Sequence, residues 1–420
     1  MRWHTQGESA NRHIRTALAL RQGECQHGPV EISDVAALRS AAGRVLLDSI
    51  GRYDSAATMR IAETLAAAGN PAELVAAALT QARLRERARG RFGADADRML
   101  FTPDGLEQAT RATVAAHRAA RLTGAGHRRV ADLCCGIGGD TIALARAGCF
   151  VEAFELDPVT AAVAAANADE LGLTGRARVT CADATAVDRT GFDAVFLDPS
   201  RRAGGRRIFD PGAYLPPWPF VAETLAGAAC VKVAPGIPHG LVPAGVEAEW
   251  VSDHGEVKEA ALWSGAFRTT SRRATLLPSG ATLTDGAPGR PPVRAPGRWL
   301  YEPDGAVIRA HLVAEVAEAM GGALLDPRIA YLTTEAPVPT PFATAYEVTD
   351  VLPFALKPLR ALLKAQDVGI VTVKKRGSPI EPETLRRQLR LSGSAHAVVI
   401  VTRVAGKPTV VLCRPPQPAA

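Results

Sequence analysis

The segment Ala131-Asp132-Leu133-Cys134-Cys135-Gly136-Ile137-Gly138-Gly139-Asp140 is the starting point for predicting the fold of this chain. A β-branched strand is expected over residues 130–134, and a helix over residues 140–147 follows the glycine-rich turn. Glycines let the backbone turn sharply and leave room for a nucleotide-like ligand. Gly136, Gly138 and Gly139 lie closer together than the glycines of the Gly-x-Gly-x-x-Gly dinucleotide fingerprint. No Gly-Lys-Ser/Thr follows them, which excludes a P-loop. For this segment alone, a plain tight turn remains the alternative.

Short β-branched runs alternate with Ala-rich helical stretches on both sides of this turn, from residue 128 to about residue 267. Further strands are expected over residues 150–155, 178–181, 192–197, 230–233, 248–252 and 259–263, and further helices over 158–171 and 214–226. This alternation predicts an α/β fold with a mostly parallel, doubly wound sheet covered on both faces. The short connection between the last two strands predicts an antiparallel hairpin at the sheet edge.

Carboxylates stand at the ends of three of the predicted strands. Glu155, nineteen residues after Gly136, can accept both hydroxyls of a ribose, or can be a solvated acid. Asp183 can accept the amino group of an adenine or cap a turn, and Asp198 ends a buried apolar strand. Together with the glycine turn, these acids predict an S-adenosylmethionine (SAM) site of the class I methyltransferase type. The expected cofactor-binding residues are Asp132, Cys134, Gly136, Gly138, Glu155, Asp183 and Asp198.

Several segments of the chain are also similar to one protein family. They are Leu106-Glu107-Gln108-Ala109-Thr110, residues 132–140, Phe154-Glu155-Leu156-Asp157-Pro158, Asp198-Pro199-Ser200-Arg201-Arg202 and, in the tail, residues 371–377 and 382–390. From about residue 35 onward, the chain resembles bacterial class I SAM-dependent methyltransferases with a C-terminal THUMP-like domain. The resemblance implies a Rossmann-like catalytic domain and an RNA substrate (tRNA or rRNA), because THUMP domains are associated with tRNA modification.

Asp198 and Pro199 are the expected catalytic residues. In amino-methylating enzymes the comparable tetrad is Asp/Asn-Pro-Pro-aromatic, which holds the hydrogens of the target amine. This sequence has Ser200 and Arg201 in place of the second proline and the aromatic residue, so the stacking platform is missing at that position. Arg201 and Arg202 are suited to gripping the phosphates of a substrate, although solvated arginines on a loop are the alternative. Lys232 and Trp218 are further residues that could line the substrate side.

The cysteines and histidines do not predict other chemistry. No cysteine follows Pro199, so a covalent pyrimidine-C5 mechanism is not expected. Cys134, Cys135, Cys181 and Cys230 fit small buried apolar side chains, and seven scattered thiols fit a reducing cytoplasm. The nine histidines do not cluster with Cys or Asp, so no metal site is expected.

Length and composition predict a multidomain globular protein in the cytoplasm. The chain has 420 residues, 47% of them hydrophobic, and contains no apolar run of the roughly 18–20 residues that a membrane span needs. Its first residues lack the layout of a secretory signal. The net charge of +6 permits binding of a polyanion without demonstrating it. Arg83, Arg85, Arg87, Arg89 and Arg91 fit a solvated helix face better than a nucleic-acid stripe.

Six regions are expected along the chain. They are a loose segment (1–33), a helical region (34–121), the methyltransferase domain (122–285), a Pro/Gly-rich linker (286–298), a helical connecting segment (299–345) and a small α+β THUMP-like domain (346–420). A helix is expected at 307–320. The last domain should contain strands at 369–373, 397–402 and 409–412 and helices at 354–365 and 382–389. Lys374 and Lys375 follow the first of these strands and are expected to meet RNA phosphates.

The sequence therefore predicts a SAM-dependent methyltransferase that acts on a base nitrogen of RNA, with the terminal domain delivering the RNA. Two alternatives remain open. One is methylation of a small molecule or a protein, and the other is a catalytically weak SAM-binding scaffold for RNA.

Overall fold

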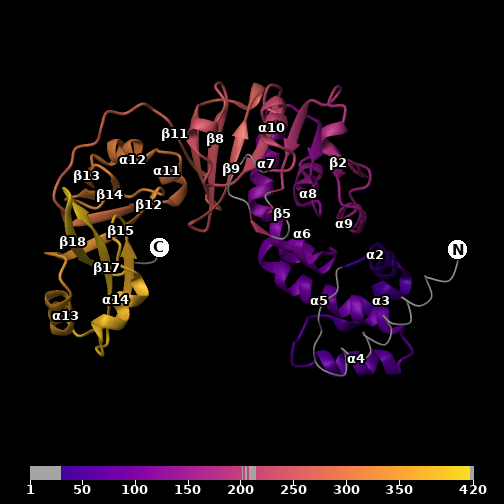
Figure 1. Cartoon of the computed structure of the whole chain (residues 1–420), viewed down its shortest axis with the longest axis horizontal. Helices are drawn as coiled ribbons and strands as arrows, with labels where there is room; N and C mark the ends of the chain where they lie inside the picture. Colours follow the sequence, from indigo (N-terminus) through magenta and orange to yellow (C-terminus); the bar gives the residue numbers. More distant parts are fainter. Residues whose placement is uncertain (1–29, 201, 204–205, 208–213, 417–420) are drawn as a thin grey trace. The chain divides into compact units, whose positions relative to one another are not determined.

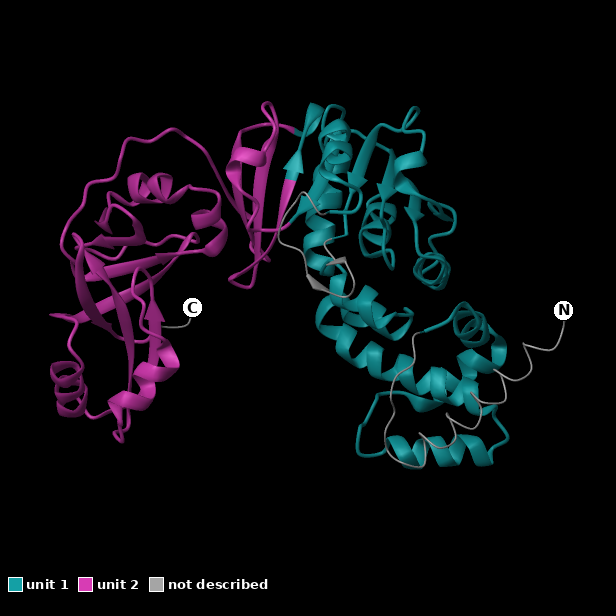
Figure 2. Ribbon diagram, viewed as in Figure 1, with its two compact units in different colours: residues 1–233, 262–267 teal, residues 234–261, 268–420 magenta. Residues whose placement is uncertain are grey.

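The computed structural model describes residues 30–200, 202–203, 206–207 and 214–416 of the chain. The chain divides into two compact units, shown in separate colours in Figure 2. The first contains the residues up to Val233 together with Leu262–Phe267, and the second contains Ala234–Ala261 together with the residues from Arg268 onward. No helix among the described residues has the length and apolar character needed to cross a membrane.

The first part of unit 1 is helical, as its sequence pattern predicts. Its helices are α2 (Ile32–Arg39), α3 (Ala41–Ile50), α4 (Thr58–Ala67), α5 (Ala72–Phe92), α6 (Pro103–Gln108) and α7 (Ala112–Gly124) (Figure 1). Leu38, Leu47, Leu79 and Leu84 belong to one apolar core, which extends to Val163 of the neighbouring α/β part. This shared core joins the helices to the layer that carries the cavity described below.

The α/β part of unit 1 confirms the predicted parallel strands. They are β1 (Arg129–Leu133), β2 (Phe150–Glu155), β3 (Ala177–Cys181), β4 (Ala194–Leu197) and β7 (Ala229–Val233), and they lie in the order β7-β4-β1-β2-β3. The pairs between these neighbours are parallel. Helix α8 (Gly139–Arg146) follows β1, and α9 (Pro158–Glu170) follows β2. Between β4 and β7 lie the two-residue strands β5 (Arg202–Ala203) and β6 (Arg206–Arg207).

The helix that precedes β7 is shorter than expected. We expected it over residues 214–226, but α10 spans Trp218–Thr224. The reason lies in Leu215-Pro216-Pro217, because a residue before proline disfavours the helical backbone and proline lacks the N–H that a helix interior uses.

The predicted hairpin does not form the edge of the sheet. Strands β8 (Glu247–Asp253) and β9 (Glu256–Trp263) are neighbours joined by two residues, but β10 (Arg272–Leu277) pairs in parallel with β8. Strand β11 (Ala281–Thr284) then pairs antiparallel with β10. All seven residues of β8 are buried, and the carboxylate of Glu249 accepts a hydrogen bond from Thr275 of β10 at 2.6 Å. An edge strand would leave this acid without that partner.

The rest of unit 2 is built on a seven-stranded sheet in the order β13-β14-β12-β15-β18-β17-β16. Its strands are β12 (Trp299–Pro303), β13 (Ala323–Asp326), β14 (Ile329–Thr334), β15 (Ala343–Pro353), β16 (Val368–Lys375), β17 (Ala395–Val404) and β18 (Lys407–Cys413). Helices α13 (Leu356–Ala365) and α14 (Pro382–Leu389) pack their leucines into an apolar core with β16 to β18. These last three strands and both helices confirm the predicted elements of the tail.

Residues 299–345 differ from the predicted helical connection. They contain β12, β13 and β14, and the helix expected at 307–320 is broken into α11 (Gly305–Arg309) and α12 (Val313–Met320). His311, between these helices, has a left-handed φ of 57°, which ends the helical path. Strands β13 and β14 form a hairpin around a tight turn at Pro327-Arg328.

Candidate functional site

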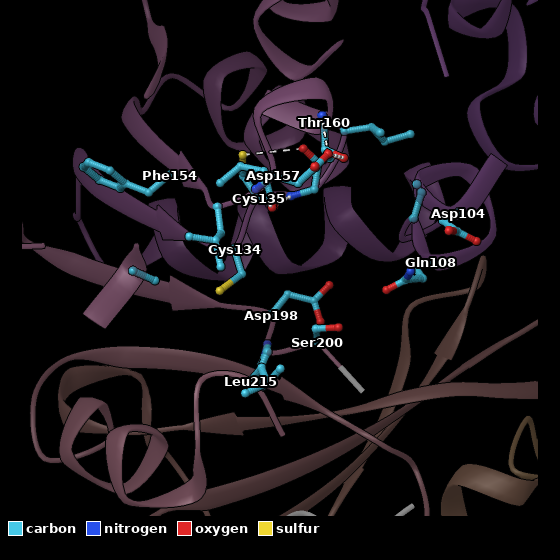
Figure 3. A pocket seen from close by; sticks show the side chains of 18 of the residues that line it. Asp104, Gln108, Cys134, Cys135, Phe154, Asp157, Thr160, Asp198, Ser200 and Leu215 are labelled. Atoms are coloured by element: carbon cyan, nitrogen blue, oxygen red, sulfur yellow. Dashed lines mark hydrogen bonds between the residues drawn. The ribbon is translucent and has the colours of Figure 1, made fainter. Parts of the chain in front are cut away.

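A cavity of about 1430 Å³ lies in unit 1 at the carboxyl ends of its parallel strands. Four strands contribute to its wall immediately after they end: Cys134 to Gly136 follow β1, Glu155 ends β2, Asp183 follows β3, and Asp198 follows β4. Figure 3 shows Cys134, Asp157, Asp198 and Gln108 around this space. Parallel strands place their carboxyl ends along one edge of a sheet, which is where α/β folds bind ligands. The four predicted strand ends therefore meet in one cavity.

The turn after β1 needs glycine at two positions. Gly136 and Gly138 have φ values of 56° and 86°, in the left-handed region that glycine enters without steric cost. Cys134 also has a positive φ, 63°, which is uncommon for a residue with a side chain. The turn is closed by the Gly138 amide, which donates to the carbonyl of Cys135 at 3.0 Å. This conformation brings backbone to the cavity wall without bulky side chains.

Glu155 fixes the glycine turn to the end of β2. Its Oε2 accepts a hydrogen bond from the Gly136 amide at 2.9 Å, and its Oε1 accepts one from the Asp157 amide at 3.0 Å. A carboxylate has about four acceptor sites, so both oxygens retain capacity for further donors. Glu155 lines the cavity and can accept hydroxyl groups there while holding the turn in place.

Asp183 caps a turn and also lines the cavity. Its Oδ1 accepts hydrogen bonds from the amide and the hydroxyl of Thr185, both at 2.8 Å, so it caps a short 3-10 turn. These hydrogen bonds hold the pKa of the Asp183 carboxyl below its usual range. Asp183 also lines the cavity, so a negative charge faces the ligand space.

Asp198 lies in an ion pair that the sequence did not predict. Its Oδ2 accepts a hydrogen bond from Lys232 Nζ at 2.6 Å, and Lys232 also donates to Thr110 Oγ1 at 3.0 Å. Lys232 is only 6% exposed, whereas Asp198 is half-buried. Pro199 is buried and belongs to the cavity wall. Thirty-four residues separate Lys232 from Asp198, so no local pattern connects them.

Ser200 and Leu215 lie side by side in the cavity wall. The amide of Ser200 donates to the carbonyl of Leu215 at 2.7 Å, and the amide of Leu215 donates back at 3.1 Å. Leu215 is 58% exposed, and with Pro216 and Pro217 it forms an apolar part of the cavity wall. Trp218 is not among the cavity-lining residues and packs edge-on against Tyr214, at 6.4 Å between ring centroids.

Arg201, expected to bind substrate, lies outside the described residues. The backbone of Arg202 is described, in β5.

Two predicted cofactor-binding residues, Asp132 and Gly138, do not line the cavity. Asp132 is completely buried, and one of its carboxylate oxygens accepts a hydrogen bond from the Thr141 hydroxyl of α8. Burial, together with the nearby charge of Asp140, raises the pKa of Asp132 to about 8. Asp132 is therefore bonded to α8, and Gly138 closes the turn, while neither lines the ligand space.

Helix α6 and its flanks form a wall that the sequence did not assign to the site. Residues 102–105 and 107–110 line the cavity, among them Asp104 and Gln108 (Figure 3). Arg91 of α5 holds this wall, because its Nη1 donates to the carbonyls of Leu106, Glu107 and Ala109 at 2.6, 2.8 and 3.1 Å. One signal for this wall was present in the sequence, because residues 106–110 resemble the family, but the resemblance assigned them no role in the site.

The row of arginines on α5 is not the fully solvated face that the sequence favoured. Besides Arg91, Arg85 donates to the carbonyl of Met99 at 2.9 Å, and Arg89 pairs with Glu86 and Asp97. At least these three arginines therefore hold the helical region together.

The cavity wall is strongly acidic. Among the described residues that line it, seven are acids and Lys232 is the single base. The acids are Asp104, Glu107, Asp140, Glu155, Asp157, Asp183 and Asp198. Asp198 is paired with Lys232 and Asp140 with Arg118, but the remaining acids leave an excess of negative charge. The wall therefore suits a cationic group such as a sulfonium.

Lys374 and Lys375 lie in unit 2, near the end of β16. Lys374 Nζ pairs with Glu302 at 2.5 Å and lies 5.7 Å from the centre of the Tyr346 ring, while Lys375 pairs with Glu381. Both lysines are partly exposed and already have internal partners.

The six described cysteines form no disulfide. Cys135 and Cys230 are buried as expected, Cys134 is half-buried, and Cys181 is exposed, so the buried interpretation is wrong for Cys181. Burial raises the pKa of the Cys134 thiol, which disfavours a reactive thiolate in the cavity. In the described part of the chain, no group of His, Cys, Asp or Glu could hold a metal ion.

Comparisons with known proteins follow the division of the chain. Family models match a methyltransferase domain at residues 130–200, a THUMP domain-like region at 343–415 and a domain of unknown function at 31–88. Proteins described as uncharacterized SAM-dependent methyltransferases from two strains of Mycobacterium tuberculosis are 38% identical over 347 residues, covering 79% of this chain and 95% of theirs. A protein from Porphyromonas gingivalis W83 assigned as a methyltransferase shares the fold, with a TM-score of 0.70 and 24% identity over 83% of this chain and 92% of that one.

Proposed function

The chain belongs to the SAM-dependent methyltransferases, and from this membership we propose that it methylates a base nitrogen of RNA. The observation that carries the proposal is that Asp198 shares one cavity with Glu155 and Asp183. An acid suited to holding an amine thus lies next to acids suited to holding an adenosyl group. The THUMP domain-like match at residues 343–415 supports RNA as the acceptor.

The cavity fits the methyl donor in charge and in hydrogen-bonding groups. Glu155 would accept the ribose hydroxyls, Asp183 the adenine amino group, and the turn from Cys134 to Gly136 would lie against the nucleoside. When bound, SAM supplies a methyl group on a positively charged sulfur. The acidic wall would stabilise that charge.

Asp198 would act on the acceptor by positioning it. Its Oδ1 can accept an N–H of the target amine, which turns the nitrogen lone pair toward the methyl group. With SAM bound, the methyl group would pass to that nitrogen and leave the sulfur as a neutral thioether, and Asp198 would be placed to take the proton that the nitrogen releases. Alignment contributes most to such an in-line displacement, and effective molarities of well-oriented reactions reach about 10⁵ M and more.

Leu215, Pro216 and Pro217 would supply the surface for the flat ring of the base. The aromatic residue of the amine-methylating tetrad is replaced by Arg201 in this chain. Leu215 is exposed in the cavity wall and is held beside Ser200 by two backbone hydrogen bonds. These three residues therefore provide an apolar surface in the same cavity as Asp198, which can replace the missing stacking platform.

Transfer of labelled methyl groups from SAM tests this function. RNA, protein and small-molecule extracts of a strain lacking the gene are incubated separately with the purified protein, and nucleosides from the labelled RNA are identified by mass spectrometry. We expect label in RNA, on a base nitrogen. Label in the protein extract or in small molecules contradicts the RNA proposal, and label in no fraction favours the scaffold alternative.

An Asp198→Asn variant tests the role of the acid within the same assay. We expect SAM to bind with an unchanged Kd, because Asp198 faces the acceptor, and we expect transfer to fall by about 100-fold or more, the size of effect that loss of one positioned group has. Transfer at the wild-type rate would remove Asp198 from the mechanism.

A further inference from the structure

Lys232 is a buried cation between the proposed acceptor acid and the helical part of unit 1. Every residue of β7, from Ala229 to Val233, is buried, and Lys232 itself is 6% exposed. Its ammonium group has two described partners, Asp198 Oδ2 at 2.6 Å and Thr110 Oγ1 at 3.0 Å. Burying an ammonium group is costly unless it is paired, so these contacts fix where the lysine can lie.

Thr110 gives the lysine a rigid point of attachment. It is buried and lies just beyond α6, whose last carbonyls are held by three hydrogen bonds from Arg91. A lysine chain has several rotatable bonds, and a second hydrogen bond to a fixed hydroxyl removes much of that freedom. The position of Nζ is therefore set by the helical region, and Nζ in turn sets the position of Asp198 Oδ2.

We propose that Lys232 is a positioning residue for methyl transfer. It holds Asp198 through Oδ2, in one orientation and with its negative charge balanced, so that Oδ1 stays directed to the acceptor. This inference rests on the proposed role of Asp198 toward the acceptor. Lys232 of β7 and its partner Thr110 thus join the residues at the four strand ends as parts of the site.

The first test compares kinetics and cofactor binding in a set of variants. Lys232→Met removes the charge, Lys232→Arg keeps it, and Thr110→Val removes only the second anchor. Lys258→Met is the matched control, because Lys258 is a poorly exposed strand lysine paired with Glu256 in β9. Rates are measured with labelled SAM and total RNA from the deletion strain, and SAM binding is measured by calorimetry.

We expect Lys232→Met to lower kcat by about 100-fold, the effect of a small misplacement of a reacting group. The Kd for SAM should remain within about threefold of wild type, since a lost charge pair on the acceptor side does not remove a cofactor contact. Lys232→Arg should recover a large part of the rate, Thr110→Val should lie between them, and Lys258→Met should match wild type. A kcat for Lys232→Met within twofold of wild type would overturn the proposal, as would equal losses in kcat, SAM affinity and melting temperature.

A second test does not depend on the acceptor. The chain has seven lysines, so the ¹H–¹⁵N NMR signals of its ammonium groups are few. Lys232 should give a slowly exchanging signal that is absent in Lys232→Met and shifts in both Asp198→Asn and Thr110→Val. No shift in Asp198→Asn would refute the link. If the link is present but wild-type protein labels no RNA, the proposed function fails while the lysine–aspartate coupling stands.

Discussion

Glu155 has two tasks, because the carboxylate that faces the ligand space also accepts hydrogen bonds from two backbone amides. Replacing it with alanine removes a charged acceptor from the ligand and frees the Gly136 amide. Hydrogen bonds to charged groups contribute about 1.5–3 kcal/mol each. We expect Glu155→Ala to weaken SAM binding by at least tenfold in calorimetry.

The matched control for this variant is Glu152→Ala. Glu152 lies in the same strand and pairs with exposed Arg129 at 3.4 Å, away from the cavity. Its removal should leave the Kd for SAM unchanged. Equal SAM affinities for the two variants would contradict the role given to Glu155.

Asp132 links the stability of the turn to pH. Burial raises its pKa in the folded chain to about 8, whereas an aspartate in the unfolded chain titrates near 3.9. The folded state therefore holds the proton of Asp132 more tightly than the unfolded state does. The stabilisation that protonated Asp132 gives to the folded state is complete below about pH 4 and is lost as the pH rises toward 8. We expect the melting temperature of the wild-type protein to fall more steeply between pH 5 and pH 8 than that of Asp132→Asn. Asp48→Asn, at an exposed position of α3, is the control, and parallel curves for Asp132→Asn and wild type would refute the assignment.

At the scale of elements, α6 is too short to be stable alone and depends on the contacts that α5 makes with its C-terminal end. Arg91→Met removes the three hydrogen bonds to carbonyls at this end. We expect the free energy of unfolding to fall by about 1–3 kcal/mol, the cost of leaving such acceptors unpaired. We also expect SAM to bind several-fold more weakly, because the α6 wall would be less firmly held. Denaturant titration and calorimetry measure both effects.

Arg87→Met controls for the loss of an arginine from the same helix, since Arg87 is exposed. It should leave stability and SAM affinity near wild type. If Arg91→Met behaved in the same way, α6 would not depend on this arginine.

The elements that the sequence predicted correctly are those with a strong local pattern. The strands before Gly136 and Glu155 and the helix that Pro158 begins were predictable because apolar runs, glycines and caps are adjacent in the chain. Strands β12 to β14 are no shorter than β1 to β4, but they were not predicted because no glycine turn or strand-end acid of a ligand site marks them in the sequence. The acids of the site follow such local patterns. The Lys232–Asp198 ion pair, in contrast, spans 34 residues, and the α6 wall is held by Arg91 from 15 to 18 residues away.

At the scale of the whole molecule, the prediction concerns RNA. The lysines at the end of β16 already pair with Glu302 and Glu381, so part of their charge is neutralised within unit 2. Replacing Lys374 and Lys375 with methionine should weaken RNA binding and lower the slope of log affinity against log salt by less than the roughly 1.4 expected for two free phosphate contacts to a single strand. Fluorescence anisotropy with total tRNA at several salt concentrations measures the slope, and SAM affinity should not change. An unaltered RNA affinity would exclude these lysines from the interface.

The hydrogen bond between Lys232 and Thr110 spans 122 residues, and this has a consequence for how the protein is made. A chain emerges from the ribosome beginning at its N-terminus, so Thr110 is available long before β7 has been translated. The helical region can fold early, but the acceptor side of the pocket lacks Lys232 until β7 joins the sheet. The acceptor side of the site is thus completed late in biogenesis, and a nascent or truncated chain that ends before β7 would contain Asp198 without the lysine that holds it.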